Sequence, residues 1–450
     1  WFHRDVSQLS GGQKQLLNLA SVMAMQPDLL ILDEPTSQLD PIAASDFLET
    51  LKRINREIGT TIIMTEHRLE AVLPMSDRVL VLDKGSIILD DTPQTVGEEL
   101  AKLNHDMFLA MPSPMQIYAG LLKAQNRILI PLGGNETTGI RCPITVRNGR
   151  KWLTEIFENL RIDTRYLEER KEKAGRFIKK TGDKPIIELK DVWFKYGRNE
   201  PYAVKGLSLK ISASRLHCLV GGNGTGKTTA LALIGGIHKP YRGKVLFQGR
   251  EISKYKREEL FNGHLGILPQ NPQSLFVEKT VELDLLEILD KKALSINGKK
   301  SKVRGIAELL EIESLLNMHP YALSGGEQQW AALGKILLLE PEIILLDEPT
   351  KGLDSHFKAK LADIINTLLK KGITVVMVSH DIEFCAKYGD KCSLFFDGNI
   401  VATNTPDKFF SGNSFYTTAA NRMSRHIFNN AVTAKDVIDL CIQNLMIQKD

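Results

Sequence analysis

The chain has 450 residues, of which 43% are apolar and 25% charged, and its formal net charge of +4 lacks the basic excess typical of nucleic-acid binding. This length predicts about three domains, or two domains with a linker, in a soluble globular protein. Its five cysteines include no C-x-x-C pair, which disfavours a disulfide framework or a zinc site, and no apolar run approaches the roughly 20 residues that cross a bilayer.

The first half of the repeat in this chain occupies residues 1 to about 100. Leu9-Ser10-Gly11-Gly12-Gln13 comes first, a strand-sized apolar run then leads into Asp33-Glu34, and a further strand-like run ends at His67. The same elements recur in the same order and, to within one residue, at the same spacing, as Leu323–Glu327, Leu346–Thr350 and Thr374–His380, and a Leu-Asp pair ending at Asp40 recurs at Asp354. Four elements that repeat in order predict two homologous halves.

Residues 101–185 connect these halves. A charged, helix-like run from Leu160 to Lys180 closes this region, which is interrupted by Pro112, Pro114, Pro131 and Pro143. Prolines mark turns and helix ends, and such a charged run is typical of a solvated helix. We therefore predict a first domain over 1–100, a linker over 101–185, a second domain over 186–405 and a C-terminal extension over 406–450.

The second half carries an upstream portion that begins near Ile186. Ser324 therefore follows a long stretch of its own half, whereas Ser10 has only nine residues before it. Comparison of the halves predicts that roughly 130 residues of the first are absent. Because the chain begins with Trp1 rather than Met, we interpret it as a fragment.

A glycine-rich segment in the second half has the pattern G-x-x-x-x-G-K-T. It follows a predicted buried strand, Leu216–Val220, and precedes a predicted helix. Glycines let backbone N–H groups close round phosphates at a helix N-terminus, whose dipole favours anions. Lys227 would reach the β- and γ-phosphates, and the Thr228 hydroxyl would bind Mg²⁺. The predicted phosphate-binding residues are Gly221, Gly222, Asn223, Gly224, Thr225, Gly226, Lys227, Thr228 and Thr229.

A second apolar strand, predicted over 341–346, ends in the carboxylates Asp347 and Glu348. Parallel α/β sheets bind ligands at the carboxyl ends of their strands, so we expect this pair beside the phosphate loop. Asp347 would hold Mg²⁺, directly or through water, and Glu348 would polarise the attacking water. An acidic pair at a helix start is the simpler alternative, but it does not explain why the neighbouring residues repeat.

Three more residues are candidates for contacts with a nucleotide. Gln270 lies in a predicted loop and is suited to sensing the γ-phosphate or the metal. His380 ends the next strand and could donate a hydrogen bond to the γ-phosphate. Tyr196 could stack on adenine. Taken alone, each would also be an ordinary surface or packing residue.

These motifs resemble those of the ATP-binding cassette family over about residues 1–100 and 186–405. The resemblance implies an α/β fold with two P-loop cassettes, each a mixed sheet with a helical signature subdomain, the first incomplete. It implies hydrolysis of ATP with Mg²⁺ and head-to-tail cassette pairing, in which the phosphate loop meets Ser10, Gly11, Gly12 and Gln13. The other site would retain its counterparts Asp33, Glu34, His67, Ser324, Gly325 and Gly326 without a phosphate loop.

A narrower resemblance rests on the linker phrase 142–150 and the tail 409–422, which are similar to the double ATPase of energy-coupling-factor vitamin importers. It implies a motor for uptake of a small molecule such as a vitamin or metal ion, at the cytoplasmic face of the cell membrane. The implied partners are a transmembrane coupling subunit and a separate substrate-capture membrane protein. The family also implies that the segment after Gln270 accepts a helix of the coupling subunit. The stretch 273–277 offers apolar anchors for it, unless Leu275 and Phe276 fill the core.

Two other classes of cassette protein are alternatives. A tandem cassette acting on ribosomes also lacks membrane spans, but the near-neutral charge and the absence of a basic arm count against it. A DNA-repair or chromosome ATPase would carry long coiled coils or a zinc insert between phosphate loop and signature, and the interval from Lys227 to Ser324 is too short for either. We expect no nucleic-acid partner.

Overall fold

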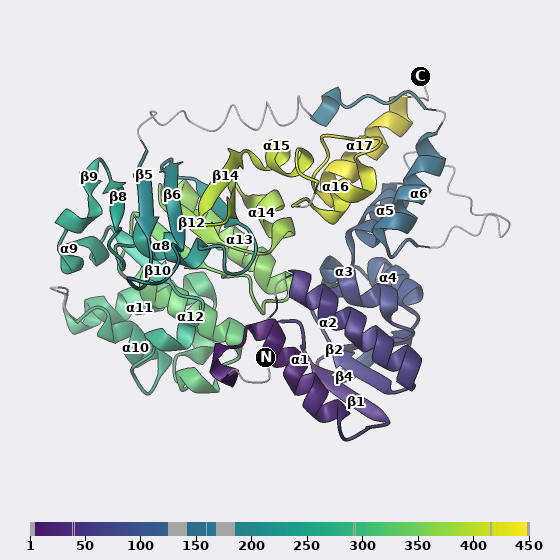
Figure 1. Cartoon of the computed structure of the whole chain (residues 1–450), viewed down its shortest axis with the longest axis horizontal. Coiled ribbons are helices and arrows are strands. Elements are labelled where there is room, and N and C mark those ends of the chain that lie inside the picture. Colours follow the sequence, from purple (N-terminus) through teal and green to yellow (C-terminus); the bar gives the residue numbers. More distant parts are fainter. Residues whose placement is uncertain are drawn as a thin grey trace. The chain divides into compact units, whose positions relative to one another are not determined.

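The computed structural model describes residues 5–37, 39, 41–124, 142–158, 160–167, 185–290, 292, 294–414 and 416–447. Trp1, Asp40, Pro131 and most of the run predicted over 160–180 lie outside these residues. The chain divides into a first unit (Trp1–Ile178, Asp354–His356 and Phe410–Asp450) and a second unit (Lys179–Leu353 and Phe357–Phe409). Both units combine strands and helices, which confirms the predicted α/β class (Figure 1).

A six-stranded sheet lies at the centre of the second unit. Its strands are β7 (Leu216–Val220), β10 (Leu265–Leu268), β11 (Ile343–Asp347), β12 (Thr374–Val378), β13 (Lys391–Phe396) and β14 (Asn399–Asn404). They are ordered β10-β11-β12-β7-β13-β14, all parallel except β14. Every residue of β7, β11 and β12 is buried, as expected of the apolar runs that form central strands of parallel sheets.

A smaller antiparallel sheet shares the core of this unit. It consists of β5 (Ile187–Phe194), β6 (Val204–Ile211), β8 (Arg242–Phe247) and β9 (Arg250–Glu251), in the order β6-β5-β8-β9. Buried residues from both sheets pack in one hydrophobic cluster, which includes Leu189 and Phe247 from the smaller sheet and Leu219, Leu345 and Val376 from the larger.

The helices of the second unit include a group of three, α10, α11 and α12, that pack against one another. The helices are α8 (Lys227–Ile234), α9 (Arg257–Phe261), α10 (Val281–Glu287), α11 (Ile296–Leu310), α12 (Gly325–Leu337), α13 (Ser355–Lys370), α14 (Ile382–Tyr388) and α15 (Pro406–Ser411), with 3-10 turns η5 (Ile252–Lys254), η6 (Pro272–Leu275), η7 (Glu313–Leu315) and η8 (Pro320–Ala322). Ser324 caps α12 in a reciprocal box with Glu327, which gives the Leu-Ser-Gly-Gly-Glu motif a local structural reason.

The first half of the repeat forms part of the first unit. Its strands are β1 (Leu29–Asp33), β2 (Thr61–Thr65), β3 (Val79–Asp83) and β4 (Ser86–Asp91), and its helices are α1 (Gly11–Met23), α2 (Pro41–Arg53), α3 (Leu69–Val72) and α4 (Pro93–Lys102). Short turns separate them at η1 (Val6–Gln8), η2 (Ile54–Ile58), η3 (Leu73–Met75) and η4 (Asp106–Ala110). Ser10 and Gln13 cap α1 in the same reciprocal way as Ser324 and Glu327 cap α12.

Apolar strand residues are exposed in the first unit. Among its described residues, β1 pairs in parallel with β2, and β3 pairs antiparallel with β4. Ile31 in β1 is 70% exposed, whereas Leu345, its counterpart in β11, is fully buried. Ile63 in β2 is likewise exposed and its counterpart Val376 is buried. The same sequence pattern thus lies at the surface in one half and in the core of the other.

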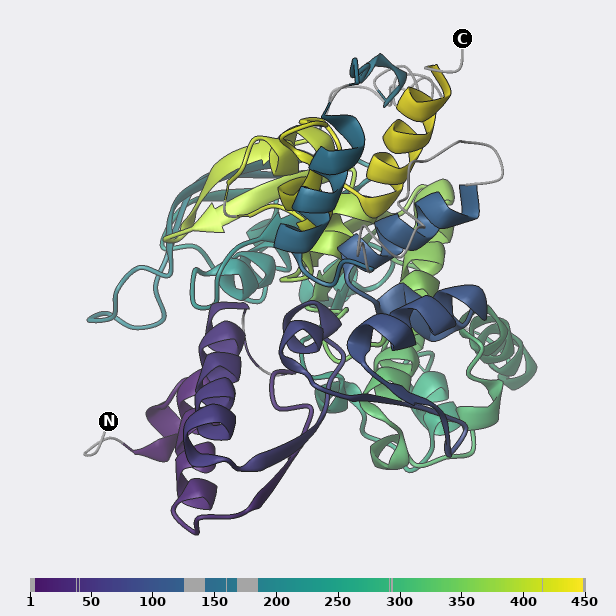
Figure 2. The same ribbon diagram turned by 90° about the vertical axis from the view of Figure 1, so that its right-hand side faces the viewer.

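Two segments far apart in the sequence, 113–167 and 419–447, share one helical core. Helices α5 (Ser113–Ala124) and α6 (Val146–Phe157) precede the second unit in sequence, and α16 (Ala419–Ser424) and α17 (Ala434–Ile447) follow it. Both views show these blue and yellow helices side by side (Figure 2). Gly149 lies where α6 approaches α16: a Cβ there would lie 2.6 Å from the sulfur of the Met423 side chain, which would have to shift.

The cysteines and the helix lengths bear on the sequence-based expectations. All five cysteines are buried and none forms a disulfide: Cys142, Cys218, Cys385, Cys392 and Cys441. Within the described part of the chain, no helix is both long enough and apolar enough to cross a membrane.

Candidate functional site

The glycine-rich segment links β7 to α8, as the sequence predicts. Gly226 occupies the N-cap of α8 and offers no side chain to the first N–H groups of the helix, which are therefore available to an anion. The Lys227 ammonium folds back over the loop and donates to the carbonyl oxygens of Gly221 and Gly222, at 3.0 and 2.8 Å. The loop therefore holds a buried cation and a free helix N-terminus together.

Two glycines of this loop leave no room for a side chain. A Cβ on Gly221 would lie 2.2 Å from the Phe395 carbonyl oxygen, and one on Gly226 would lie 2.3 Å from the Ala203 carbonyl oxygen. Gly226 also has a φ of 104°, in the left-handed region that favours glycine. The glycine pattern predicts that another group approaches the backbone of this loop closely. It does not identify that group as the carbonyl of Ala203 or of Phe395.

Thr228 and Asp347 meet at the carboxyl end of the sheet. The Thr228 hydroxyl donates to Asp347 Oδ1 at 3.2 Å. Burial raises the pKa of Asp347, and the bond from Thr228 opposes this rise. Hydroxyl and carboxylate oxygens are the ligands that Mg²⁺ prefers, and Mg²⁺ usually binds one or two carboxylates together with substrate phosphates. The two side chains therefore fit a magnesium ion.

Glu348 is held by His380, which lies two residues beyond the end of the neighbouring strand β12. The His380 backbone N–H donates to Glu348 Oε2 at 3.0 Å, and His380 Nε2 lies 3.0 Å from Oε1. Burial raises the pKa of Glu348 to about 7, against the opposing charge of Lys227. A carboxyl group with a pKa near neutrality is suited to proton transfer. The same contact recurs in the first unit, where His67 Nε2 lies 2.9 Å from Glu34 Oε1.

Sequence reasoning missed a pair of hydroxyl groups behind Glu348. Thr350 and Ser379 are buried, with their hydroxyl oxygens 3.1 Å apart, and the Ser379 backbone N–H donates to the Leu219 carbonyl at 3.2 Å. This pair joins the loop after β11 to the strand that leads into the phosphate loop. The available signal was the threonine that recurs at Thr36.

Tyr196 and Gln270 lie at the surface. The Tyr196 hydroxyl is 2.8 Å from that of Thr229 in the first turn of α8, and its ring meets Phe194 and His238 edge-on. This arrangement keeps an exposed aromatic ring beside the phosphate loop. Gln270 is exposed just beyond β10, the strand next to β11, so it lies at the same sheet edge as Asp347.

The signature residues occupy helix starts in both units. Ser10, Gly11 and Gly12 begin α1, and Ser324, Gly325 and Gly326 begin α12. Asp33 and Glu34 follow β1 in the way that Asp347 and Glu348 follow β11. The pairing of the phosphate loop with Ser10, Gly11, Gly12 and Gln13 stays a prediction.

Comparison with known proteins identifies the family. A profile described as ABC transporter matches residues 2–37 and 204–351. A relative from Bacillus anthracis, named "Putative ABC transporter ATP-binding protein", is 38% identical over 446 residues, which are 99% of this chain and 75% of the relative. The chain belongs to the ABC transporter ATP-binding family. It is accordingly an ATP-hydrolysing subunit of an ABC transporter, a class whose cassettes pair with transmembrane subunits.

Two further similarities concern proteins of narrower description. A Bacillus subtilis protein named "Putative HMP/thiamine import ATP-binding protein" is 30% identical over 407 residues, which are 90% of this chain and 67% of that protein. The solved structure of cbiO1 from Clostridium perfringens, described as part of the ABC transporter complex cbiONQ, is 26% identical, with a TM-score of 0.47. That match covers 51% of this chain and 92% of cbiO1.

Proposed function

We propose that this ABC transporter subunit drives an importer of the energy-coupling-factor type, which takes up a small molecule such as a vitamin or metal ion. The observation that carries the catalytic part is the buried Glu348 carboxylate, which follows Asp347 at the strand end that meets the phosphate loop. The import part is supported by the Bacillus subtilis relative, whose name specifies import of HMP/thiamine.

Five side chains would carry the chemistry. Lys227 and the N–H groups at the uncapped start of α8 would bind the phosphates, and Thr228 and Asp347 would hold Mg²⁺. When bound, Mg²⁺ neutralises negative charge that develops on the phosphates. Ionised Glu348 accepts a hydrogen bond from the attacking water, and His380 keeps that carboxylate in place through the two contacts described above. Beside them, Gln270 would contact the γ-phosphate or metal and Tyr196 would stack on adenine.

We further propose that the first cassette, over 1–100, is incomplete in this chain, and that 186–405 is the complete one. The exposure of Ile31 and Ile63, whose counterparts are buried, supports this view, because apolar strand faces are normally covered. Strands equivalent to β7 and β10 would cover them in the complete protein. The segment 101–185 would be the linker between the two cassettes.

The segment after Gln270 is a candidate docking surface for the transmembrane subunit, but only part of its apolar stretch 273–277 is exposed. Phe276 is buried, which favours the alternative that its side chain fills the core. The next residue, Val277, is 71% exposed, and Leu283 and Met318 are exposed nearby, since the Val281 N–H donates to the Met318 carbonyl. We propose that Val277, Leu283 and Met318 contact an apolar helix of the partner.

Val277→Asp tests this docking surface. In the protein expressed with its transmembrane partners, the substitution should abolish co-purification and transport, while ATP binding by the isolated chain stays unchanged. Val401→Asp is the matched control, because Val401 is also a surface valine. It lies in β14 and its side chain is 58% exposed. Equal loss of transport in both variants, or normal co-purification of Val277→Asp, would contradict the assignment.

Transport is favoured over action on ribosomes by the names of the relatives, which are transporter subunits. We propose a peripheral position on the cytoplasmic face of the membrane, held by the coupling subunit and a separate substrate-capture protein. Affinity purification of the tagged protein from detergent-solubilised membranes tests both readings. Recovery of ribosomal proteins in place of integral membrane proteins would overturn the transport proposal.

A further inference from the structure

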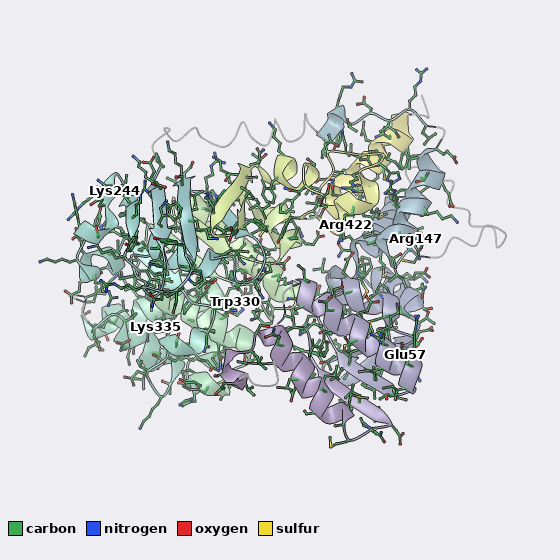
Figure 3. All side chains as sticks on the ribbon, in the orientation of Figure 1. Glu57, Arg147, Lys244, Trp330, Lys335 and Arg422 are labelled. Atoms are coloured by element: carbon green, nitrogen blue, oxygen red, sulfur yellow. The ribbon has the colours of Figure 1, made fainter. Side chains whose placement is uncertain are left out.

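Lys335 is a buried lysine in the last turn of the signature helix α12 (Figure 3). Its side chain is 7% exposed. The ammonium lies 2.9 Å from the Leu275 carbonyl oxygen, 2.7 Å from Asp284 Oδ1 and 3.1 Å from Glu287 Oε2. An ammonium group has three N–H donors, and three acceptors surround this one.

Asp284, the partner of Lys335, is also buried, with its side chain 1% exposed. Its Oδ1 accepts from the Val277 N–H at 3.0 Å and its Oδ2 from the Glu278 N–H at 3.3 Å. The ion pair thus joins three pieces of chain: α12, α10 and the segment 275–278. That segment begins a few residues after Gln270 and contains the exposed Val277.

The repeat shows that a signature helix does not itself require this lysine. Helix α1 has the same Ser-Gly-Gly start and the same capping box as α12, but Ser21 occupies the position of Lys335. A buried ion pair is also a poor source of net stability, because removing two charges from water offsets most of their attraction. The pair therefore calls for an explanation other than helix formation.

We propose that Lys335 is a positioning residue that couples the segment 275–278 to the signature helix, so that the two move as one body when nucleotide binds near Gln270. This inference rests on the proposed function. A charged clamp suits the task because it fixes direction as well as distance, through four hydrogen bonds that meet at one carboxylate and one ammonium. A movement of α12 would then be transmitted through Val277 to the transmembrane subunit docked there.

Hydrogen exchange of the full chain, with and without Mg-ATP, tests the clamp. In the unchanged chain, Mg-ATP should slow exchange at 221–228 and at 275–278. In Lys335→Met, protection at 221–228 and the ATP Kd should stay within about twofold of the original values. The exchange rate at 275–278 should rise by about tenfold or more, because hydrogen bonds to a charged group are lost. Exchange at 275–278 should also no longer change when ATP is added.

Two further variants keep the test decisive. Lys335→Arg retains the charge and should retain the ATP response at 275–278. Should Lys335→Met alone fail to fold, Lys335→Met combined with Asp284→Asn removes both charges and avoids a buried unpaired carboxylate. A normal ATP response at 275–278 in the uncharged variants would overturn the clamp. Absence of protection at 221–228 in the unchanged chain would instead overturn the nucleotide-binding proposal, and this inference with it.

Discussion

Glu348 differs from ordinary surface glutamates in burial and in partner. It is held by His380 at the end of β12, and its backbone has a φ of 52°, in the left-handed region. A non-glycine residue there is strained by about 1–3 kcal/mol, and such strain concentrates at functional sites. These features separate Glu348 from Glu342, which is half exposed at the other end of the same strand and pairs with His264.

Glu348→Gln should retain ATP binding and slow hydrolysis by about 100-fold or more, because the amide cannot accept the proton of the attacking water. Phosphate release in the reconstituted transporter, together with an ATP titration, measures both quantities. Glu342→Gln is the control and should leave hydrolysis unchanged. Full turnover by Glu348→Gln would refute the assignment of the base.

The pKa of Glu348 also predicts a pH dependence of stability. Burial raises it from 4.5 to about 7, so between these values the folded chain binds more protons than the unfolded chain. The free energy of unfolding must therefore fall as pH rises through this window. Glu348→Gln removes this pH dependence. The free energy of unfolding of the variant, minus that of the unchanged chain, should therefore rise by on the order of 2–3 kcal/mol between pH 5 and pH 8. Urea unfolding without nucleotide measures it, and a constant difference would contradict the shift.

Residue identities at this site could be predicted better than residue contacts. The motif fixed the positions of Lys227, Thr228 and Asp347 relative to strand ends, because local patterns determine those ends. The contact of His380 with Glu348, and the burial of Phe276 beside an exposed Val277, depend on side-chain directions that one sequence does not specify.

The phosphate loop as an element is constrained by the backbone carbonyls that pack against its glycines. Gly226→Ala should abolish ATP binding or destabilise the second unit by about 3 kcal/mol or more, since the new Cβ would meet the Ala203 carbonyl in a left-handed conformation. Gly224→Ala is the matched control: Gly224 is also left-handed, with a φ of 71°, but its surroundings are open. We expect a cost of about 1–2 kcal/mol there. Thermal unfolding and ATP titration compare the two, and equal losses would contradict the packing argument.

Elements with continuous apolar runs were predictable, and elements joined across long sequence distances were not. The apolar runs of β7 and β11 predicted buried strands, each followed by a functional loop, and both strands are fully buried. The sequence did not predict that α6 packs against α16, although parts of both segments carry the narrower family resemblance. Their contact joins segments that lie on opposite sides of the second unit in the sequence, and several buried side chains take part in it, including Trp152, Phe157 and Met423.

At the scale of the whole chain, the repeat predicts the number of nucleotides bound. The P-loop motif occurs once in the sequence, at 221–228, so the chain should bind about one ATP by the logic of that motif. Calorimetric titration with Mg-ATP measures the stoichiometry. Two equivalent sites would contradict the proposal, and Lys227→Ala, which removes the ammonium over the loop, should bring binding toward zero.

The buried cysteines bear on how motions of this chain can be followed. All five thiols are enclosed, and burial raises the pKa of Cys142 to about 12, so little of it is thiolate at neutral pH. A cysteine introduced at a surface position such as Val277 would thus react with a maleimide probe far faster than the native thiols. A spin label or fluorophore could be attached there without first removing any of the natural cysteines.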